Sequence, residues 1–350
     1  MLDDYSWTLG PFTREDAFNP CLTPSAAATF ECPVRKAPVA WEAKDVFNPA
    51  AVVRDGKVYL LYRAEDTVGR HAGTSRIGLA ESVDGRTFLR RPEPVLYPDN
   101  DFMNVYEWEG GCEDPRIVED DAGRYYLTYT AYDGRLARLA VAVSDDLVRW
   151  RKCGLAFANT SGGKYVDLWS KSGAIICRRS GERLIATRIN GVYWMYWGES
   201  SIYLAQSDNL IDWEIIHHAD LPNQLRAAFG LRGGRFDSNL VEPGPPALLT
   251  DAGIVFIYNS KNDATHGDPT LPPGTYAAGQ VLLDPRDPSA VLRRVTSPFL
   301  QPERDYEITG QVGNVCFLEG LVYFKGEWLL YYGTADSKIA LARAVATPNA

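Results

Sequence analysis

A glycine-centred segment with the same order of residues recurs five times along the chain. Each copy has a turn glycine, a run rich in Tyr, Val, Leu and Ile, and a polar end, at residues 54–66, 120–133, 179–190, 250–263 and 324–336. Aromatic and β-branched runs that follow a turn glycine are typical of β-hairpins. The turn glycines lie 58 to 73 residues apart and are Gly56, Gly123, Gly181, Gly253 and Gly326. This spacing predicts five structural repeats built from strands.

An apolar run precedes each segment and a second alternating run follows it, so that one repeat contains three or four strands. Repeats of this length with up to four strands each are typical of β-propellers. The sequence therefore predicts an all-β fold, a five-bladed β-propeller, with a two-sheet sandwich as the alternative. No linker interrupts residues 1–350, which predicts a single domain. The last repeat ends soon after its third strand, and residues 1–44 are expected to close that blade or to cap the propeller.

Composition and charge exclude several functions. A formal net charge of -9 and a pI near 5.1 argue against nucleic acid or an anionic membrane as the main partner. No run of 18 apolar residues is present and the first residues lack the pattern of a signal peptide, so the expected location is the cytoplasm. The six cysteines form no Cys-x-x-Cys pair and the four histidines form no His-x-His pattern. We therefore expect no disulfide, no metal and no cofactor.

Polar residues recur at equivalent positions of the repeats. One set stands at the start of the innermost strand of each repeat: Asn48, Asp114, Lys171, Glu242 and Asn314. A second set follows the next strand: Arg63 with Asp66, Asp133, Asn190, Asn259 and Asp336. In a propeller both sets converge on the central axis, where ligand sites are common. Taken singly, an Asp or Asn at such a position can instead cap the strand or tighten a turn.

Three carboxylates are candidates for acid–base chemistry: Asp114 in EDPR, Glu199 in WGES and Glu242 in VEPG. Cleavage of a glycosidic bond needs a proton donor for the leaving oxygen and a base or nucleophile opposite it, and carboxyl groups supply both roles. Aromatic residues make up 12% of the chain, and one set is expected to stack on sugar rings: Trp169, Tyr193, Trp194, Tyr196, Trp197 and Tyr306. For the YWMYW run, a core strand is the alternative.

The motifs FNPA (47–50), LLYRAED (60–66), CEDPRI (112–117), EPGPPALLT (242–250) and YYGTADSKIALA (331–342) resemble those of glycoside hydrolase family 130. The resemblance covers roughly residues 45 to 345 and implies a five-bladed propeller that acts on β-mannosides. It assigns the general acid to Asp114, which in the phosphorylases of the family acts through a substrate hydroxyl. Around the sugar at the cleaved bond it places Asn48, Arg63, Arg116 and Asp336. Further candidate substrate contacts are Asp66, Glu113, Lys171, Tyr193, Asn259 and Tyr306.

Members of that family divide into inverting phosphorylases, which use inorganic phosphate, and inverting hydrolases, which use water. The phosphorylases have a Tyr-His-Gly segment where this chain has Tyr258-Asn259-Ser260, and a Lys where this chain has Glu242. A carboxylate in place of a cation repels phosphate and suits the activation of water. With Glu199 as a second carboxylate, the resemblance favours an exo-acting inverting hydrolase of β-1,2-linked manno-oligosaccharides.

Two alternatives stay open at this point. A mannoside phosphorylase could still bind phosphate through Arg63 and Lys171, and a carbohydrate-binding propeller would lack catalysis altogether. Five-bladed arabinanases and invertases are less favoured because they lack the combination of EDPR and YYGTAD. The expected partner is a manno-oligosaccharide, and assembly into a homo-oligomer is left open.

Overall fold

The computed structural model describes residues 5–71 and 73–345, and strands make up nearly all of its regular structure. Among these residues the helices are limited to single turns at α1 (Asn104–Glu107), α2 (Asp305–Ile308) and a 3-10 segment, Thr160–Gly163. The predicted all-β class is therefore confirmed. Residues 1–4 and 346–350, at the two ends of the predicted domain, lie outside the described residues.

The five predicted hairpins are present, and each has its glycine at or beside the turn. The φ angles of these glycines lie between 64° and 134°, a range that side chains other than glycine rarely adopt. The glycines are Gly56, Gly123, Gly181, Gly253 and Gly326. The repeated turn glycine in the sequence therefore has a conformational cause.

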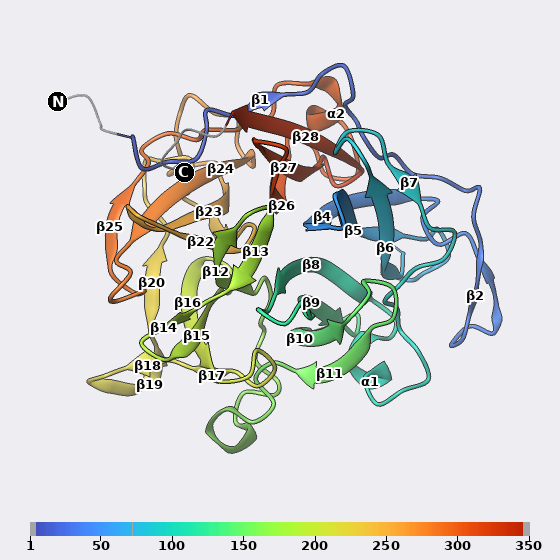
Figure 1. Ribbon diagram of the computed structural model, residues 1–350, viewed down its shortest axis with the longest axis horizontal. Helices are drawn as coiled ribbons and strands as arrows, with labels where there is room; N and C mark the ends of the chain where they lie inside the picture. The colour runs from blue at the N-terminus through green and yellow to red at the C-terminus, as the bar shows by residue number, and fades with distance from the viewer. Residues whose placement is uncertain (1–4, 72, 346–350) are drawn as a thin grey trace.

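Consecutive antiparallel strands form five groups around a common centre, and Figure 1 shows the groups in chain order from blue to red. Three groups are simple successions of neighbouring strands. Group 1 contains β4 (Asp45–Arg54), β5 (Lys57–Glu65), β6 (Ser75–Ser82) and β7 (Leu89–Arg90). Group 2 contains β8 (Gly111–Glu119), β9 (Tyr125–Tyr132), β10 (Ala137–Ser144) and β11 (Arg151–Leu155). Group 5 contains β26 (Cys316–Phe324), β27 (Glu327–Thr334) and β28 (Lys338–Val345), with β1 (Thr13–Arg14) paired to β28.

Group 3 departs from the predicted plan because an extra hairpin interrupts it. It contains β12 (Ala174–Ser180), β13 (Arg183–Ala186), β14 (Arg188–Ile189), β15 (Val192–Trp197), β16 (Ser201–Ser207), β17 (Glu214–Ile215) and β20 (Ala227–Gly230). The turn between β14 and β15 is Asn190-Gly191, with both residues at positive φ, as in a tight hairpin turn. The inner strand β12 consequently pairs first with β15 and then with β13.

Group 4 has a divided inner strand. It contains β21 (Leu240–Pro243), β22 (Ala247–Thr250), β23 (Gly253–Lys261), β24 (Tyr276–Leu283) and β25 (Val291–Arg294). Both β21 and β22 pair with β23, and the break between them falls at Gly244-Pro245-Pro246, where two residues lack a backbone N–H. Two small hairpins lie outside the groups: β2 (Phe30–Cys32) with β3 (Ala37–Val39), and β18 (His217–His218) with β19 (Leu221–Leu225).

The hydrophobic core lies between neighbouring groups. Leu61 of β5 and Leu79 of β6 share one cluster with Ile117 of β8 and Leu127 of β9, which joins groups 1 and 2. Short parallel pairings add hydrogen bonds between neighbours, as between β12 and β22. Since the faces of the strands pack against neighbouring groups, polar side chains are accommodated at the strand ends around the centre.

Candidate active site

The inner strands β4 and β8 share a local feature that turns one polar side chain toward the other. Asn48 and Asp114 have positive φ angles of 46° and 47°, and the strand register shifts at each. Asn and Asp tolerate this backbone region better than most residues do. The Asn48 amide donates a hydrogen bond to Asp114 Oδ1 over 3.0 Å, and both side chains are buried. A side chain at Gly333 of β27 would collide with Asn48, so the glycine of the YYGT motif makes room for this contact.

Arg63 of β5 gathers the carboxylates on the side of groups 1 and 2. Its guanidinium lies 2.8 Å from Glu65 Oε1, 2.9 Å from Glu113 Oε1 and 3.1 Å from Asp114 Oδ1. Its Nε donates to Ser75 Oγ over 3.0 Å. Each of the three guanidinium nitrogens therefore contacts a group of the protein, and these contacts fix the EDPR segment in place.

Lys171, just ahead of β12, connects the three candidate catalytic carboxylates. Its Nζ lies 3.1 Å from Glu242 Oε1, 3.8 Å from Asp114 Oδ2 and 4.0 Å from Glu199 Oε2. The hydroxyl of Ser172 also donates a hydrogen bond to Glu242. Burial alone would lower the pKa of Lys171, but Glu242, Asp114 and Glu199 outweigh it and keep the ammonium charged. Asp114, Lys171 and Glu242 belong to three different repeats, and the fold brings them together.

Neighbouring charges and burial give the carboxyl groups of the site different pKa values. Burial acts to raise the pKa of Asp114, but the charges of Arg63 and Lys171 and the hydrogen bond from Asn48 lower it below its usual range. Burial raises the pKa of Glu113 to about 7. Burial likewise raises the pKa of Asp336, and the charge of Asp114 adds to the shift, so that the value is about 7. At neutral pH the site thus holds ionised and protonated carboxyl groups side by side.

Glu199 takes the position in group 3 that the sequence assigns to Asn190. Asn190 is exposed in the extra hairpin turn and donates to the carbonyl of Arg286, so it does not belong to the central set. Strand β15 instead delivers Glu199, which is partly exposed beside Lys171 and receives a hydrogen bond from Trp169. Burial and the charge of Glu242 raise the pKa of Glu199. An indole 45% exposed beside a candidate catalytic carboxylate is suited to stacking on a sugar ring.

Arg116 lies beneath the site rather than facing it. Its guanidinium donates to three backbone carbonyls, those of Gly244 (2.9 Å), Pro243 (2.5 Å) and Asp114 (3.1 Å). It also lies 3.1 Å from the fully buried Glu319. The backbone that carries Asp114 is thereby tied to the backbone that follows Glu242. A planar guanidinium with several fixed donors is suited to such a tie.

Two other residues that the sequence predicts as substrate contacts, Asp66 and Asn259, use their polar atoms in structural hydrogen bonds. Asp66 is fully buried, pairs with Arg76 over 2.7 Å and accepts hydrogen bonds from the backbone N–H groups of Val68, Gly69 and Thr74. The fully buried Asn259 exchanges two hydrogen bonds with the backbone of Leu318. Their polar atoms are engaged in holding a loop and in joining β23 to β26.

Tyr193 and Tyr306 also lie apart from the carboxylate cluster. Tyr193 stands near the start of β15, at the opposite end from Glu199, with Arg188 stacked on its ring at 4.4 Å. Tyr306 belongs to α2, and its hydroxyl contacts Asp16 at 3.5 Å. The structure gives neither tyrosine a contact with the cluster.

Several residues of the site were not predicted: Glu65, Ser172, Tyr276 and Glu319. Glu319 had the clearest signal in the sequence, since a carboxylate interrupts the apolar run FLEGLVYF. Tyr276, at the start of β24, lies close enough to Glu242 and Asp336 that burial and these two charges raise its pKa to about 12. Ser172 had no signal beyond its place next to Lys171.

Over residues 5–71 and 73–345, no three His, Cys, Asp or Glu side chains are arranged to hold a metal ion. All six cysteines are free. No helix in the described part of the chain is long and apolar enough to cross a membrane.

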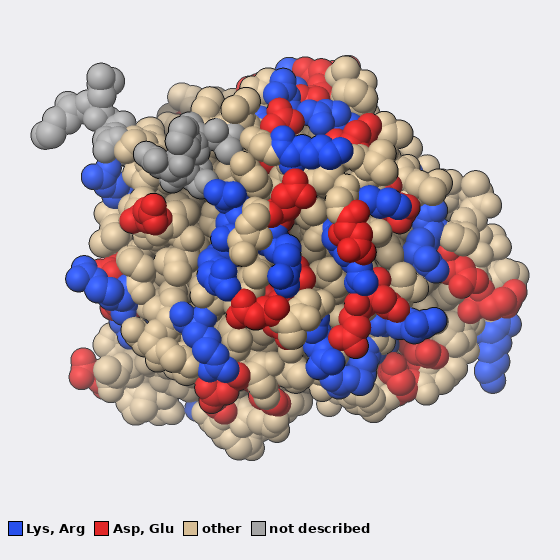
Figure 2. All heavy atoms as spheres, viewed as in Figure 1, with Lys and Arg blue, Asp and Glu red and all other residues tan. Residues whose placement is uncertain are grey.

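Figure 2 shows acidic and basic side chains interspersed over the face in view rather than gathered in an area of one sign.

A base and a proton source within one buried cluster are what cleavage of a glycosidic bond requires. The class that this fold and site define is that of the glycoside-cleaving enzymes. The chain belongs to glycoside hydrolase family 130, whose profile, described as beta-1,4-mannooligosaccharide phosphorylase, matches residues 13–347.

Relatives of the chain include both phosphorylases and hydrolases. The 1,2-beta-oligomannan phosphorylase of Thermoanaerobacter sp. (strain X514) is 33% identical over 316 residues, which are 88% of this chain and 92% of that protein. A glycosyl hydrolase from Bacteroides ovatus is 45% identical with a TM-score of 0.93, over 97% of this chain and 94% of that one. A further solved structure comes from work stating that "the GH130 family of mannoside phosphorylases contains glycoside hydrolases that target beta-1,2 mannosidic linkages in Candida mannan". It is 44% identical with a TM-score of 0.94, over 100% of this chain and 99% of that one.

Proposed function

We propose that the protein is an inverting, exo-acting β-mannosidase that hydrolyses β-1,2-linked manno-oligosaccharides. In this proposal the five strand groups are the blades of one β-propeller, residues 1–350 form one catalytic domain, and the N-terminal segment (1–44) closes it. The pairing of β1 with β28 supports that closure. The structures 44% and 45% identical to this chain, both connected with glycoside hydrolases, support the reaction.

The observation that carries the proposal is the excess of carboxylates in the site. Within the described residues, four cations, Lys44, Arg63, Arg116 and Lys171, lie among seven carboxyl groups: Glu65, Glu113, Asp114, Glu199, Glu242, Glu319 and Asp336. Binding of a phosphate dianion needs cations that are not already neutralised. Here each cation lies beside at least one carboxyl group, so none is left free for phosphate, and the site suits neutral water and sugar.

Glu242 is the proposed base. Lys171 Nζ lies 3.1 Å from its carboxylate and the hydroxyl of Ser172 donates a hydrogen bond to it, which orients an oxygen that can take a proton from water. Glu199, with its raised pKa, shares the same ammonium and positions that water. Oxygens of Asp114 and Glu242 lie within 4 Å of Lys171 Nζ, so they are at most about 7 Å apart, and an inverting reaction requires a separation close to that upper bound because its carboxyl groups lie ~6.5–9.5 Å apart.

Asp114 delivers the proton to the leaving oxygen, which is the role that the family resemblance implies for it. Its lowered pKa means that Asp114 is ionised before the substrate binds. Glu113 and Asp336, with pKa values of about 7, are the groups of the same network that hold protons at neutral pH. The proposed acid function requires that bound substrate raise the pKa of Asp114 above about 7, so that a proton passes to it from Glu113 or Asp336, which are left ionised.

A phosphorylase is the second candidate, because Lys171 is present in the site and the 33% identical relative is a phosphorylase. Product analysis separates the two reactions. The protein is incubated with β-1,2-mannobiose, with and without 10-fold excess of inorganic phosphate, and the products are followed by NMR. We expect mannose alone under both conditions, formed first as the α-anomer, and no product from Asp114→Asn. Formation of mannose 1-phosphate in the phosphate sample would establish phosphorolysis instead.

A further inference from the structure

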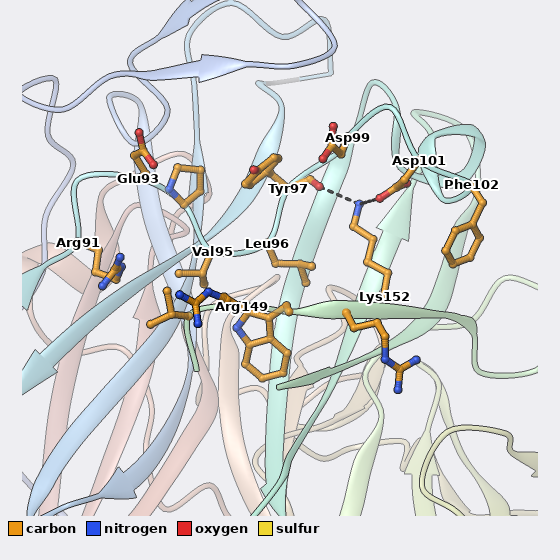
Figure 3. Close-up of a pocket in the computed structure, with 14 residues that line it drawn as sticks. Arg91, Glu93, Val95, Leu96, Tyr97, Asp99, Asp101, Phe102, Arg149 and Lys152 are labelled. Carbon is orange, nitrogen blue, oxygen red and sulfur yellow. Dashed lines mark hydrogen bonds and ion pairs between the residues drawn. The ribbon is translucent and has the colours of Figure 1, made fainter. Parts of the chain in front are cut away.

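A cavity of about 490 Å³ lies at the outer edge of groups 1 and 2, away from the central carboxylates. It is enclosed by the segment 91–102, which leads from β7 toward β8, and by residues 148–152 at the start of β11 (Figure 3). We call it the rim pocket. Among the described residues that line it there is none of the candidate catalytic carboxylates. Its volume is in the range that holds a small ligand.

The walls of the rim pocket are held in place by a buried lysine. Lys152, whose side chain is only 8% exposed, donates to the carbonyl of Tyr97 (2.8 Å) and to the carboxylates of Asp101 (3.0 Å) and Glu107 (2.5 Å). The backbone N–H of Met103 donates to the other oxygen of Asp101 over 2.8 Å. These contacts lock the loop against β11, so the pocket is formed before any ligand arrives.

Two aromatic side chains, Phe102 and Trp150, line the rim pocket. Phe102 is 64% exposed although the loop on both sides of it is fixed, and its ring stands over Gly154 of β11. The indole N–H of Trp150 is bonded to the carbonyl of Leu147 over 2.9 Å, and the half-buried ring packs in part against the core that joins groups 1 and 2, so Phe102 is the more exposed of the two rings. A rigidly held, exposed aromatic ring is a feature of binding surfaces, and aromatic faces pack well on the C–H faces of sugars.

The polar side chains around these rings are of both signs. The lining contains the exposed arginines Arg91, Arg149 and Arg151 and the carboxylates Glu93, Asp99 and Asp101. Mixed donors and acceptors around aromatic faces suit a neutral ligand rich in hydroxyl groups. An anion would meet the three carboxylates as well as the three arginines, and an apolar peptide would have to desolvate all of these charges.

We propose that the rim pocket is a second, non-catalytic binding site for neutral manno-oligosaccharide chains. The proposal rests on the proposed function for the identity of the sugar. A chain held at the rim stays near the catalytic site, which raises the effective concentration of its cleavable end. Short substrates cannot gain from this arrangement, because they reach only the catalytic site.

Binding stoichiometry tests the proposal without cleavage of the ligand. The full chain with Asp114→Asn is titrated to saturation with excess β-1,2-mannan oligosaccharide of six or more residues, so that separate molecules replace any single one that spans both sites, and we expect two molecules bound per chain. Adding Phe102→Ala should leave one, whereas Phe18→Ala, which removes another exposed phenylalanine, should leave two. A single bound molecule in the Asp114→Asn protein would overturn the proposal.

Kinetics with the active enzyme give the second measurement. Phe102→Ala should raise KM about threefold or more for the long oligosaccharide and leave KM and kcat for the disaccharide unchanged. Equal effects on both substrates, competition by inorganic phosphate for the second site, or a change of oligomeric state in Phe102→Ala would each contradict the proposal. If the protein cleaves no mannoside at all, the proposed function fails, and titration with a panel of neutral oligosaccharides still decides whether the rim pocket binds sugar.

Discussion

Two regions of the molecule bury carboxylates. In one region the buried carboxylate is fully paired with cations and hydrogen-bond donors, and in the other the carboxyl groups outnumber the cations. At the edge of group 1, Asp66 has its own arginine and three backbone donors, so its charge is fully matched. In the centre, seven carboxyl groups share four cations, and neither oxygen of Glu319 has a hydrogen-bond partner among the described residues. The paired carboxylate of Asp66 holds a loop in place, whereas the central carboxyl groups, which outnumber their cations, can gain or lose protons near neutral pH.

The pKa shifts express this difference. Burial acts to raise the pKa of carboxyl groups in both regions. For Asp66 the charge and hydrogen bonds of Arg76 outweigh burial and lower the pKa. For Glu113 and Asp336 burial prevails and the pKa is about 7, even though both lie within the field of Arg63. A perturbed, unmatched carboxyl cluster is a mark of a catalytic site, and a matched pair is a mark of a structural one.

The largest expected effect comes from removing the proposed base. Glu242→Gln keeps the shape of the side chain and its contact with Ser172 but removes the negative charge beside Lys171. We expect kcat to fall about 10²- to 10⁴-fold, the usual contribution of a positioned general base, with the folded state retained. Initial rates on β-1,2-mannobiose measure this, and Glu214→Gln, on an exposed strand residue, is the control. Activity within threefold of the unaltered protein would remove Glu242 from the mechanism.

The matched region should respond in stability instead. Asp66→Asn leaves Arg76 buried without its partner, which costs about 3 to 5 kcal/mol in the free energy of unfolding at pH 7. Because the pKa of Asp66 is lowered on folding, its stabilisation is present above the unfolded pKa near 4 and is lost as the pH falls. Denaturant unfolding at pH 7 and pH 3 should show the difference shrinking in acid. The exposed Asp208→Asn is the control, and a loss of activity at full stability would instead restore Asp66 as a substrate contact.

The sequence predicts the repeat and the first polar set well, because both follow from alignment of strand starts. Asn48, Asp114, Lys171 and Glu242 occupy equivalent strand starts, and three of them meet in one cluster around Lys171 and Arg63. The extra hairpin of group 3 was missed, because segment 179–190 aligns with the other repeats and this alignment predicts Asn190 as its polar end, whereas Asn190-Gly191 is the turn between β14 and β15.

The second polar set was harder to predict. An Asp or Asn after a strand can face the centre or bond to its own loop, and the sequence does not reveal which acceptors are already occupied. Asp336 lies in the central field, whereas Asp66 and Asn259 are saturated by neighbouring backbone. The tie made by Arg116 depends on carbonyls of another repeat, and its partners Pro243 and Gly244 lie 127 and 128 residues away.

That tie gives the next prediction. Arg116→Lys retains the charge opposite Glu319 but cannot reach three carbonyls in fixed directions. Because the altered residue acts through the backbones of Asp114 and Pro243, we expect kcat to fall about tenfold with KM changed less than twofold, as for lost transition-state alignment. Arg124→Lys, at an exposed ion pair with Asp145, is the control. A rise in KM at constant kcat would show that Arg116 holds the substrate directly, as the family resemblance implies.

The smallest expected effect is the change in thermal midpoint caused by Glu319→Gln. The sign of this change at pH 8 shows whether Glu319 is neutral in the folded protein or is ionised and paired with Arg116. Burial raises the pKa of Glu319 well above its ordinary value, despite Arg116 at 3.1 Å. A carboxyl whose pKa is raised on folding stabilises the protein below its unfolded pKa, and this contribution is lost as the pH rises toward the folded pKa. Glu319→Gln, which stays neutral, should therefore leave the thermal midpoint unchanged at pH 5 and raise it by about 3 °C at pH 8. Calorimetry at the two pH values measures both midpoints. A lower midpoint at pH 8 would mean that Glu319 is ionised and paired with Arg116, so that the centre would contain a matched pair like that of Asp66 and Arg76.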